Sequence, residues 1–166
     1  RITRKTAMNS NLLSRNTNGV DLLSSRLYDN ETFYKAFSKD LSRAKLSVVI
    51  ESPFITLRRM KTLLPILTKL CIKGVQVTVN TRNPYEHDNE YELQANISVQ
   101  KMQQLGIKVL YTVNHHRKLA IIDEEVLWEG SLNILSQNDS CELMRRSASV
   151  ELVEQMTQFI GVRHWS

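Results

Sequence analysis

The sequence lacks several features that mark special classes of protein. No apolar run approaches the ~20 residues of a membrane span, and no low-complexity tract, repeat or signal peptide is present. Glycine and proline are few, at five and three residues. These absences favour an ordinary globular protein that does not enter a membrane. The sequence also lacks an initiating Met, so we expect a fragment or excised domain, although a processed terminus is equally compatible.

Cysteine is scarce as well. Cys71 and Cys141 could pair in principle, but Cys71 falls in an apolar segment with helical spacing. A reduced core cysteine is therefore the favoured interpretation. We expect an intracellular protein, either cytoplasmic or associated with the nucleoid.

The sequence has no clustered carboxylates of the kind found at two-metal sites. Basic residues outnumber acidic ones by 22 to 17, which gives a net charge of +5. That balance is compatible with a polyanionic partner such as nucleic acid or anionic lipid. Many proteins carry such a charge without binding either, so charge alone decides little.

The hydrophobic pattern predicts strands that alternate with helices in one domain with a sizeable core. Alternation of this kind implies crossovers and a sheet covered on both faces. The predicted fold class is α/β, an α/β/α sandwich with a mixed, largely parallel sheet. The predicted helices are one capped by Asn30, one over residues 56–73 and stopped by Gly74, one that ends near residue 105, and one capped by Ser149; the predicted strands are 45–51, 75–80, 107–113 and 142–147, besides a hairpin described next.

The N-terminal segment differs from the rest of the chain. Residues 1–29 are polar and rich in Asn and Ser, which predicts an irregular lead-in to a body at residues 30–166. Four leucines in this segment are available to dock on that body, namely Leu12, Leu13, Leu22 and Leu23.

Polar groups recur within the apolar segment 114–133. His116 and Lys118 are two residues apart, as are Ser131 and Asn133, and such pairs share one face of a strand. An imidazole, an ammonium, a hydroxyl and an amide that converge would form an anion site containing a nucleophile or a base. Taken singly, a His or Lys at the end of a strand is most often only solvated.

The register of this predicted hairpin decides whether the polar groups meet. A two-residue loop at Glu124-Glu125 would set the register, and opposite residues then have Cβ atoms about 5 Å apart. Two glutamates are, however, a poor match for the Gly- or Asn-rich sequences of such loops. The expected pairs are Asp123 with Val126, Lys118 with Ser131, and His116 with Asn133.

Residues 116–133 read His-x-Lys-x4-Asp-x6-Gly-Ser-x-Asn, with every spacing kept. This pattern resembles the signature (HKD motif) of the phospholipase D superfamily, which includes lipases, phospholipid synthases, tyrosyl-DNA phosphodiesterases and nucleases. The predicted order of helices and strands also fits that family's mixed-sheet domain. The resemblance therefore covers most of the chain and implies an enzyme, a phosphodiesterase whose catalytic domain spans residues 30–166.

Of the four histidines, only His116 begins a His-x-Lys pair. Many family members carry two copies of the motif and build one active site between them, so this chain holds half a site. A two-fold homodimer is the simplest way to complete it. The chain resembles the single-motif endonucleases of the family, which act on DNA or RNA. Residues 52–84 further resemble domains attached to DNA helicases and other DNA-processing enzymes.

The resemblance implies a role for each motif residue. His116 of one subunit would attack phosphorus to form a phosphohistidine, and His116 of the other would protonate the leaving group and then activate water. Lys118 and Asn133 would hold the nonbridging phosphate oxygens, with Ser131 as a further donor. Two lysines and uncharged donors can replace a metal as the electrostatic clamp, so the resemblance implies that no metal and no other cofactor is required.

A carboxylate usually supports the histidine in this family. Its position, some ten residues after the motif, selects Glu142; Asp139 is the alternative, and a solvated loop acid is a third interpretation. Asp123 and Gly130 are expected to be structural. His115 is expected to neighbour the site without taking part.

The resulting hypothesis is a metal-independent endonuclease, on DNA rather than RNA, that works as a homodimer. One alternative is a lipid phosphodiesterase or phosphatidyltransferase, although the sequence shows no hydrophobic anchor. Another is a non-catalytic nucleic-acid-binding and dimerisation domain, although pure binding needs no histidine. Candidate contacts to a nucleic-acid backbone, each more often a solvated charge when taken singly, are Arg58, Arg59, Lys61, Arg82, Arg145 and Arg146.

Overall fold

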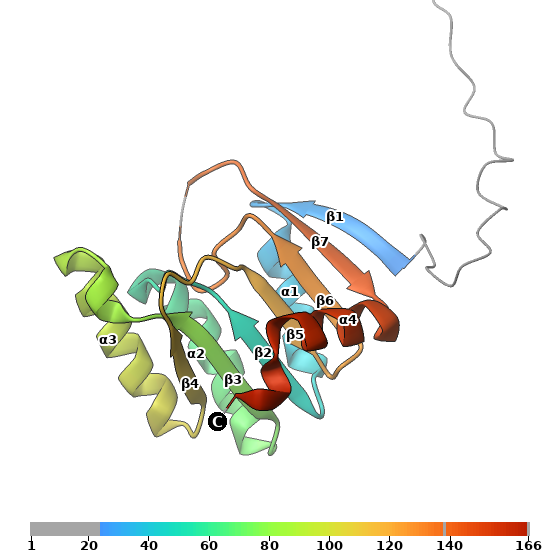
Figure 1. The fold of residues 1–166 in the computed structure, drawn as a ribbon, viewed down its shortest axis with the longest axis horizontal. Coiled ribbons are helices and arrows are strands. Elements are labelled where there is room, and N and C mark those ends of the chain that lie inside the picture. The colour runs from blue at the N-terminus through green and yellow to red at the C-terminus, as the bar shows by residue number, and fades with distance from the viewer. Residues whose placement is uncertain (1–23, 138, 166) are drawn as a thin grey trace, which may run out of the picture.

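The computed structural model describes residues 24–137 and 139–165, which form one mixed sheet between two layers of helices (Figure 1). The leucines of the predicted lead-in lie outside the described residues. The elements are β1 (Ser25–Asp29), α1 (Phe33–Arg43), β2 (Ser47–Glu51), α2 (Leu57–Ile72), β3 (Gln76–Arg82), the 3₁₀ helix η3 (Pro84–Glu86), α3 (Asn89–Gln104), β4 (Lys108–Thr112), β5 (Leu119–Ile122), β6 (Val126–Gly130), β7 (Leu143–Ala148), α4 (Val150–Ile160) and the 3₁₀ helix η4 (Val162–His164).

The sheet runs in the order β1-β7-β6-β5-β2-β3-β4. The pairs β2–β3 and β3–β4 are parallel, and the other four pairs are antiparallel. The predicted α/β/α sandwich with a mixed sheet is therefore confirmed. Its parallel part is smaller than expected, because the chain turns back into antiparallel neighbours from β5 onwards.

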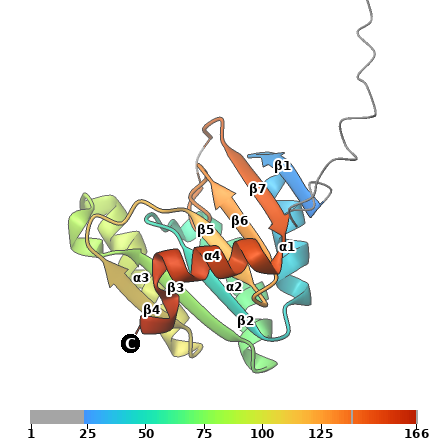
Figure 2. The ribbon, with the colours of Figure 1, turned by 45° about the vertical axis from the view of Figure 1, so that its right-hand side comes forward.

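Helices α1, α2 and α3 cover one face of the sheet, and α4 crosses the other (Figure 2). Helix α1 buries Phe33, Phe37 and Leu41, which are spaced one turn apart and lie on the same side of the helix. Both phenylalanine rings pack edge-to-face on Trp128 of β6, at centroid distances of 5.1 and 6.1 Å. The indole N–H of Trp128 also donates to the Asp40 carboxylate of α1 at 2.9 Å. These contacts fix α1 against the strand that leads into the Gly-Ser-x-Asn segment.

Two predictions about the N-terminal part are wrong. Residues 25–29 form β1, an edge strand paired with β7, rather than the end of an irregular segment. Asn30 does not cap α1: the helix begins at Phe33, and the Asp29 carboxylate accepts from the backbone N–H of Thr32. The Asn30 side chain instead accepts from the backbone N–H of Glu142 at 3.4 Å, so it links β1 to the start of β7.

Most other predicted boundaries hold to within two residues. Thr56 caps α2 through a side-chain contact with the backbone N–H of Arg59, and Gly74 ends that helix segment with a φ of 84°. Ser149 caps α4 through the backbone N–H of Leu152. Both cysteines are free, with Cys71 half-buried and Cys141 exposed. Within the described ranges, no helix combines the length and the apolarity needed to cross a membrane.

The predicted hairpin exists, but its register is wrong by one residue. Ile122 pairs with Val126, so the loop has three residues, and Lys118 lies across from Gly130 rather than Ser131. The other expected pairs, Asp123 with Val126 and His116 with Asn133, are also absent from this register. The cause is local: Asp123 and Glu124 adopt φ values of 54° and 56°, which place both residues in the turn instead of the strands.

Candidate active site

The motif residues gather at one edge of the sheet. His116 and Lys118 immediately precede β5, whereas Ser131 and Asn133 immediately follow β6. Because β5 and β6 are antiparallel, the start of one strand and the end of the other lie side by side. The carboxyl end of β2 reaches the same edge, since Glu51 pairs with Leu119.

His116 and Lys118 are in direct contact. The Lys118 Nζ lies 3.2 Å from His116 Nδ1 and donates to the His116 carbonyl oxygen at 2.7 Å. The His116 side chain is exposed and Lys118 is half-buried. Burial lowers the pKa of the Lys118 ammonium; the Glu142 carboxylate opposes this shift, and Arg82 adds to it. An exposed imidazole beside a partly desolvated ammonium can attack, or donate a proton to, a bound anion.

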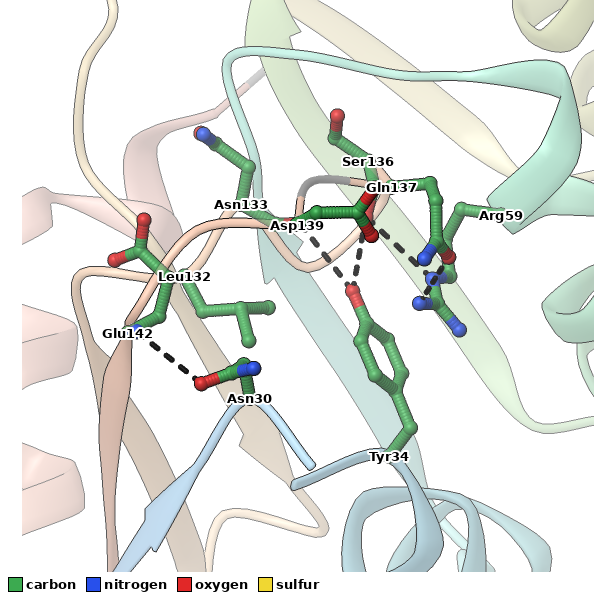
Figure 3. Close-up of a pocket in the computed structure, with 9 residues that line it drawn as sticks. All are labelled: Asn30, Tyr34, Arg59, Leu132, Asn133, Ser136, Gln137, Asp139 and Glu142. Carbon is green, nitrogen blue, oxygen red and sulfur yellow. Dashed lines mark hydrogen bonds between the residues drawn. The ribbon is translucent and has the colours of Figure 1, made fainter. Parts of the chain in front are cut away.

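Asn133 and Glu142 line one pocket of about 280 Å³, together with Tyr34, Arg59 and Asp139 among others (Figure 3). The amide oxygen of Asn133 is buried and has no hydrogen-bond partner within the described structure. Glu142 accepts from the Ser140 hydroxyl at 2.8 Å. Among the described residues, no hydrogen bond joins Glu142 to His116, and Asp139 lines the same pocket as Glu142. The assignment of Glu142 as the carboxylate that supports His116 therefore stays a prediction.

Tyr34 holds the loop that carries Asn133. Its hydroxyl donates to the Ile134 carbonyl at 2.8 Å. It also lies 3.4 Å from the Asn133 carbonyl and 3.1 Å from the Ser136 carbonyl, the two contacts drawn in Figure 3. Burial raises the pKa of Tyr34 to about 12, so the hydroxyl keeps its proton at any physiological pH. The Arg59 guanidinium stacks on the Tyr34 ring at 3.3 Å and bonds to Gln137. Sequence reasoning missed Tyr34, since its ring also fits the amphipathic pattern of α1.

Ser131 and Gly130 tie the motif to β7. The Ser131 hydroxyl accepts from the backbone N–H of Leu143 at 3.1 Å and lies 3.4 Å from the carbonyl of the same residue. At Gly130, an added Cβ would lie 2.2 Å from the Leu143 carbonyl oxygen and 2.9 Å from Met144 Cα. Only a glycine permits this approach of the two backbones.

We expect Gly130→Ala to destabilise the fold by about 3 kcal/mol, because backbone atoms must separate to admit the methyl group. Gly106→Ala is the matched control: its surroundings are open, and its φ of 86° adds only conformational strain of about 1 kcal/mol. Urea unfolding of both variants measures the difference. Equal losses of stability in the two variants would contradict the close approach at Gly130.

Asp123 anchors the β5–β6 turn to the start of β2. Its carboxylate accepts from the backbone N–H groups of Lys45, Leu46 and Ser47, the shortest contact being 2.7 Å. Its own N–H donates to the Ser47 carbonyl at 2.8 Å. The carboxylate is therefore engaged at the far end of β5 from His116, where it supports the hairpin.

The segment before His116 is held by its neighbours. The Asn114 backbone N–H donates to Glu86 at 2.9 Å, and the guanidinium of Arg82 donates to the His115 carbonyl at 3.1 Å. The His115 ring is buried, which lowers its pKa, and its Nε2 has no hydrogen-bond partner in the described structure. His115 thus neighbours the site from inside the fold.

The candidate nucleic-acid contacts divide into two groups. Arg58 and Lys61 are exposed on α2. Arg82 is bonded to the backbone, as described above. Arg59, Arg145 and Arg146 are likewise engaged within the chain, with Gln137, Ser25 and Asp40 respectively. In the part of the chain that the structure describes, no group of three His, Cys, Asp or Glu side chains could hold a metal ion.

Comparisons with known proteins point to one family. A family model described as "Cardiolipin synthase, PLD-like domain" matches residues 37–165. No curated protein matches this chain.

Several solved structures share the fold. Nuc from Salmonella typhimurium, a phospholipase D family member, superposes with a TM-score of 0.67 at 16% identity, over 82% of this chain and 90% of that one. NucT from Helicobacter pylori gives 0.63 at 18% identity, over 81% and 91%. TrmBL2, an archaeal chromatin protein with a described mode of DNA binding, gives 0.57 at 11% identity, over 83% and 52%.

Proposed function

Because this chain belongs to the phospholipase D superfamily, we propose that it is a metal-independent phosphodiesterase that cleaves nucleic acid, with DNA as the preferred substrate. The single observation that supports this most strongly is the contact between His116 and Lys118. It places a nucleophilic imidazole 3.2 Å from an ammonium at an exposed edge of the sheet. A phosphodiester bound there would meet both a nucleophile and a positive charge.

One chain supplies one motif histidine, His116, whereas hydrolysis through a covalent intermediate needs a nucleophile and a separate acid–base group. We propose that a second copy of the chain supplies that group, through a two-fold homodimer in which the two His116 rings face one phosphate. In this dimer, Lys118 and Asn133 of each copy hold the nonbridging oxygens. Ser131 can add a donor if its long contact with the Leu143 carbonyl gives way to a substrate oxygen.

The proposed reaction has two steps. In the first, a ring nitrogen of His116 forms a bond to phosphorus, the phosphorus–oxygen bond of the leaving group breaks, and His116 of the second copy gives that oxygen its proton. In the second, this same histidine takes a proton from water, the water oxygen bonds to phosphorus, and the phosphorus–nitrogen bond breaks. Glu142 would stabilise the histidine that carries the proton, because its charge already acts on the neighbouring Lys118.

Nucleic acid is preferred over lipid for two reasons. The net charge of +5 and the exposed Arg58 and Lys61 suit a phosphate backbone. Two of the similar folds belong to Nuc and NucT, and a third to a DNA-binding chromatin protein. A lipid phosphodiesterase or phosphatidyltransferase is the second candidate, because the matching family model is named for cardiolipin synthase.

We expect the chain to cleave a fluorescent oligonucleotide in excess EDTA and to release little product from phosphatidylglycerol vesicles. The chelator arm tests metal independence, and the paired substrates test the preferred class. Strict dependence on added Mg²⁺ would contradict the proposal, and preferential turnover of vesicles would favour the lipid enzyme. Salt-sensitive binding of DNA without any turnover would favour a non-catalytic domain.

A further inference from the structure

The segment that carries His116 and Lys118 is not part of a strand. Residues 113–118 join β4 to β5 outside the strands, and a long backbone contact, from the Gly130 N–H to the Lys118 carbonyl at 3.4 Å, reaches the end of this segment from β6. Their geometry therefore depends on contacts made by individual residues. Two of these contacts, at Asn114 and His115, precede the motif; a third lies within it, at Arg117.

Arg117 forms a two-point ion pair with the last residue of β2. Its Nε lies 2.7 Å from Glu51 Oε2, and its Nη2 lies 2.7 Å from Glu51 Oε1. The Glu51 side chain is fully buried, whereas that of Arg117 is 40% exposed. The fork of the guanidinium fixes both the distance and the plane of the pair.

Glu51 is itself held by the neighbouring strands. Asn80 of β3 donates through its side-chain amide to Glu51 Oε1 at 3.1 Å. The Thr112 hydroxyl of β4 donates to the Asn80 amide oxygen at 2.9 Å. Arg117 is thus connected through Glu51 to the carboxyl ends of three adjacent parallel strands, β2, β3 and β4.

A buried carboxylate is expensive to desolvate, and well-packed apolar residues often stabilise a fold as well or better. Stability alone therefore gives no reason for Glu51 at the end of the apolar strand SVVIE. Its partner lies between the two reacting residues of the motif. We propose that Arg117 and Glu51 are positioning residues, which lock the segment 115–118 so that His116 and Lys118 keep their mutual orientation for attack on a phosphodiester. This inference rests on the proposed function.

The first test uses bis(4-nitrophenyl) phosphate, a small diester with no base and no lipid chain. Arg117→Ala should lower kcat about 30-fold and change KM less than about threefold, because a displacement of about 1 Å at the reacting group is enough for such a loss. Arg163→Ala is the matched control, since Arg163 forms a similar two-point pair with Glu154, but on the exposed surface of α4. A raised KM with unchanged kcat would overturn the proposal, because Arg117 would then bind the substrate directly.

Arg117→Ala leaves Glu51 buried without its charged partner, so this variant can lose activity simply by failing to fold. The double variant Glu51→Leu/Arg117→Met removes the buried charge together with its partner. We expect its thermal unfolding to return to within a few degrees of the parent, while kcat stays about 30-fold low. Recovery of both stability and kcat in the double variant would overturn the positioning role. The function of Arg117 would then be only to neutralise the buried charge of Glu51.

A readout without turnover separates this inference from the proposed function. In protein labelled with ¹⁵N-histidine, the ring nitrogen shifts of His116 should change in Arg117→Ala and in the double variant, but not in Arg163→Ala. If the parent chain cleaves no diester, the proposed function fails while these shifts still test the positioning. Unchanged His116 shifts in both variants would overturn the positioning whether or not the parent is active.

Discussion

Replacing His116 by alanine should reduce phosphodiester cleavage by at least about 10⁴-fold, because in the proposed two-chain site the variant loses both the nucleophile and the acid–base group. The fold should be unaffected, with a change below about 0.5 kcal/mol, since the imidazole is exposed and its ring contacts the Lys118 ammonium rather than the core. Single-turnover cleavage of a labelled oligonucleotide measures the loss. His116→Asn should behave in the same way.

The covalent step gives this prediction a second readout. A substrate labelled at the scissile phosphate should leave an acid-labile adduct on the parent chain after rapid quenching, and none on His116→Ala. His164→Ala is the matched control, because His164 is exposed in η4 and belongs to no part of the motif. Cleavage or labelling that survives in His116→Ala would exclude His116 as the nucleophile.

Mixing experiments then test whether the site is shared. When parent and His116→Ala chains are mixed and allowed to exchange, a site built from two histidines exists only in parent homodimers, so activity falls as the square of the parent fraction. An equal mixture should retain about one quarter of the activity of the parent alone. Retention of about one half would show that each chain acts by itself.

The residues of the candidate site could be proposed from the sequence because the motif is a local pattern. The spacing of His116, Lys118 and Asn133 can be read directly along the chain, and the structure brings the first two into contact. The alternating apolar segments likewise predicted the sandwich, because the periodicity of buried residues is a property of sequence. The register of the hairpin was not predictable in this way. It depends on the left-handed backbone of Asp123, which is stabilised by hydrogen bonds to residues far away in the sequence at the start of β2.

Long-range polar partners account for the other omissions. Arg117 reads as an ordinary basic residue, and only the fold shows that Glu51, 66 residues away, receives its guanidinium. The one local sign was an acidic residue at the end of an apolar strand, since charged groups are rarely buried without a partner. β1 was missed because a polar edge strand such as SRLYD lacks the alternation that marks a half-buried strand.

The second large effect is expected at Lys118, where a substitution should abolish most of the activity without lowering the stability of the fold. Lys118→Met should lower kcat roughly 10³-fold, because in the proposed mechanism the ammonium stabilises the charge on the nonbridging oxygens in the transition state. At neutral pH the ammonium is charged in both the folded and unfolded chain, and burial lowers its pKa in the folded state. Its charge therefore opposes folding, and an isosteric apolar side chain should leave the melting temperature unchanged or slightly raised.

Two variants sharpen the interpretation of Lys118→Met. Lys73→Met removes a charge from the exposed end of α2 and should leave kcat within about twofold, which controls for the change in net charge. Lys118→Arg keeps the positive charge but replaces the compact ammonium beside the His116 ring with a larger, planar guanidinium. We therefore expect the kcat of Lys118→Arg to be less than about a tenth of the parent value. If Lys118→Met lost stability in proportion to its activity, the ammonium would be a structural group. If Lys118→Met lost kcat but kept a melting temperature at least as high as that of the parent, Lys118 would contribute to the reaction while destabilising the folded state.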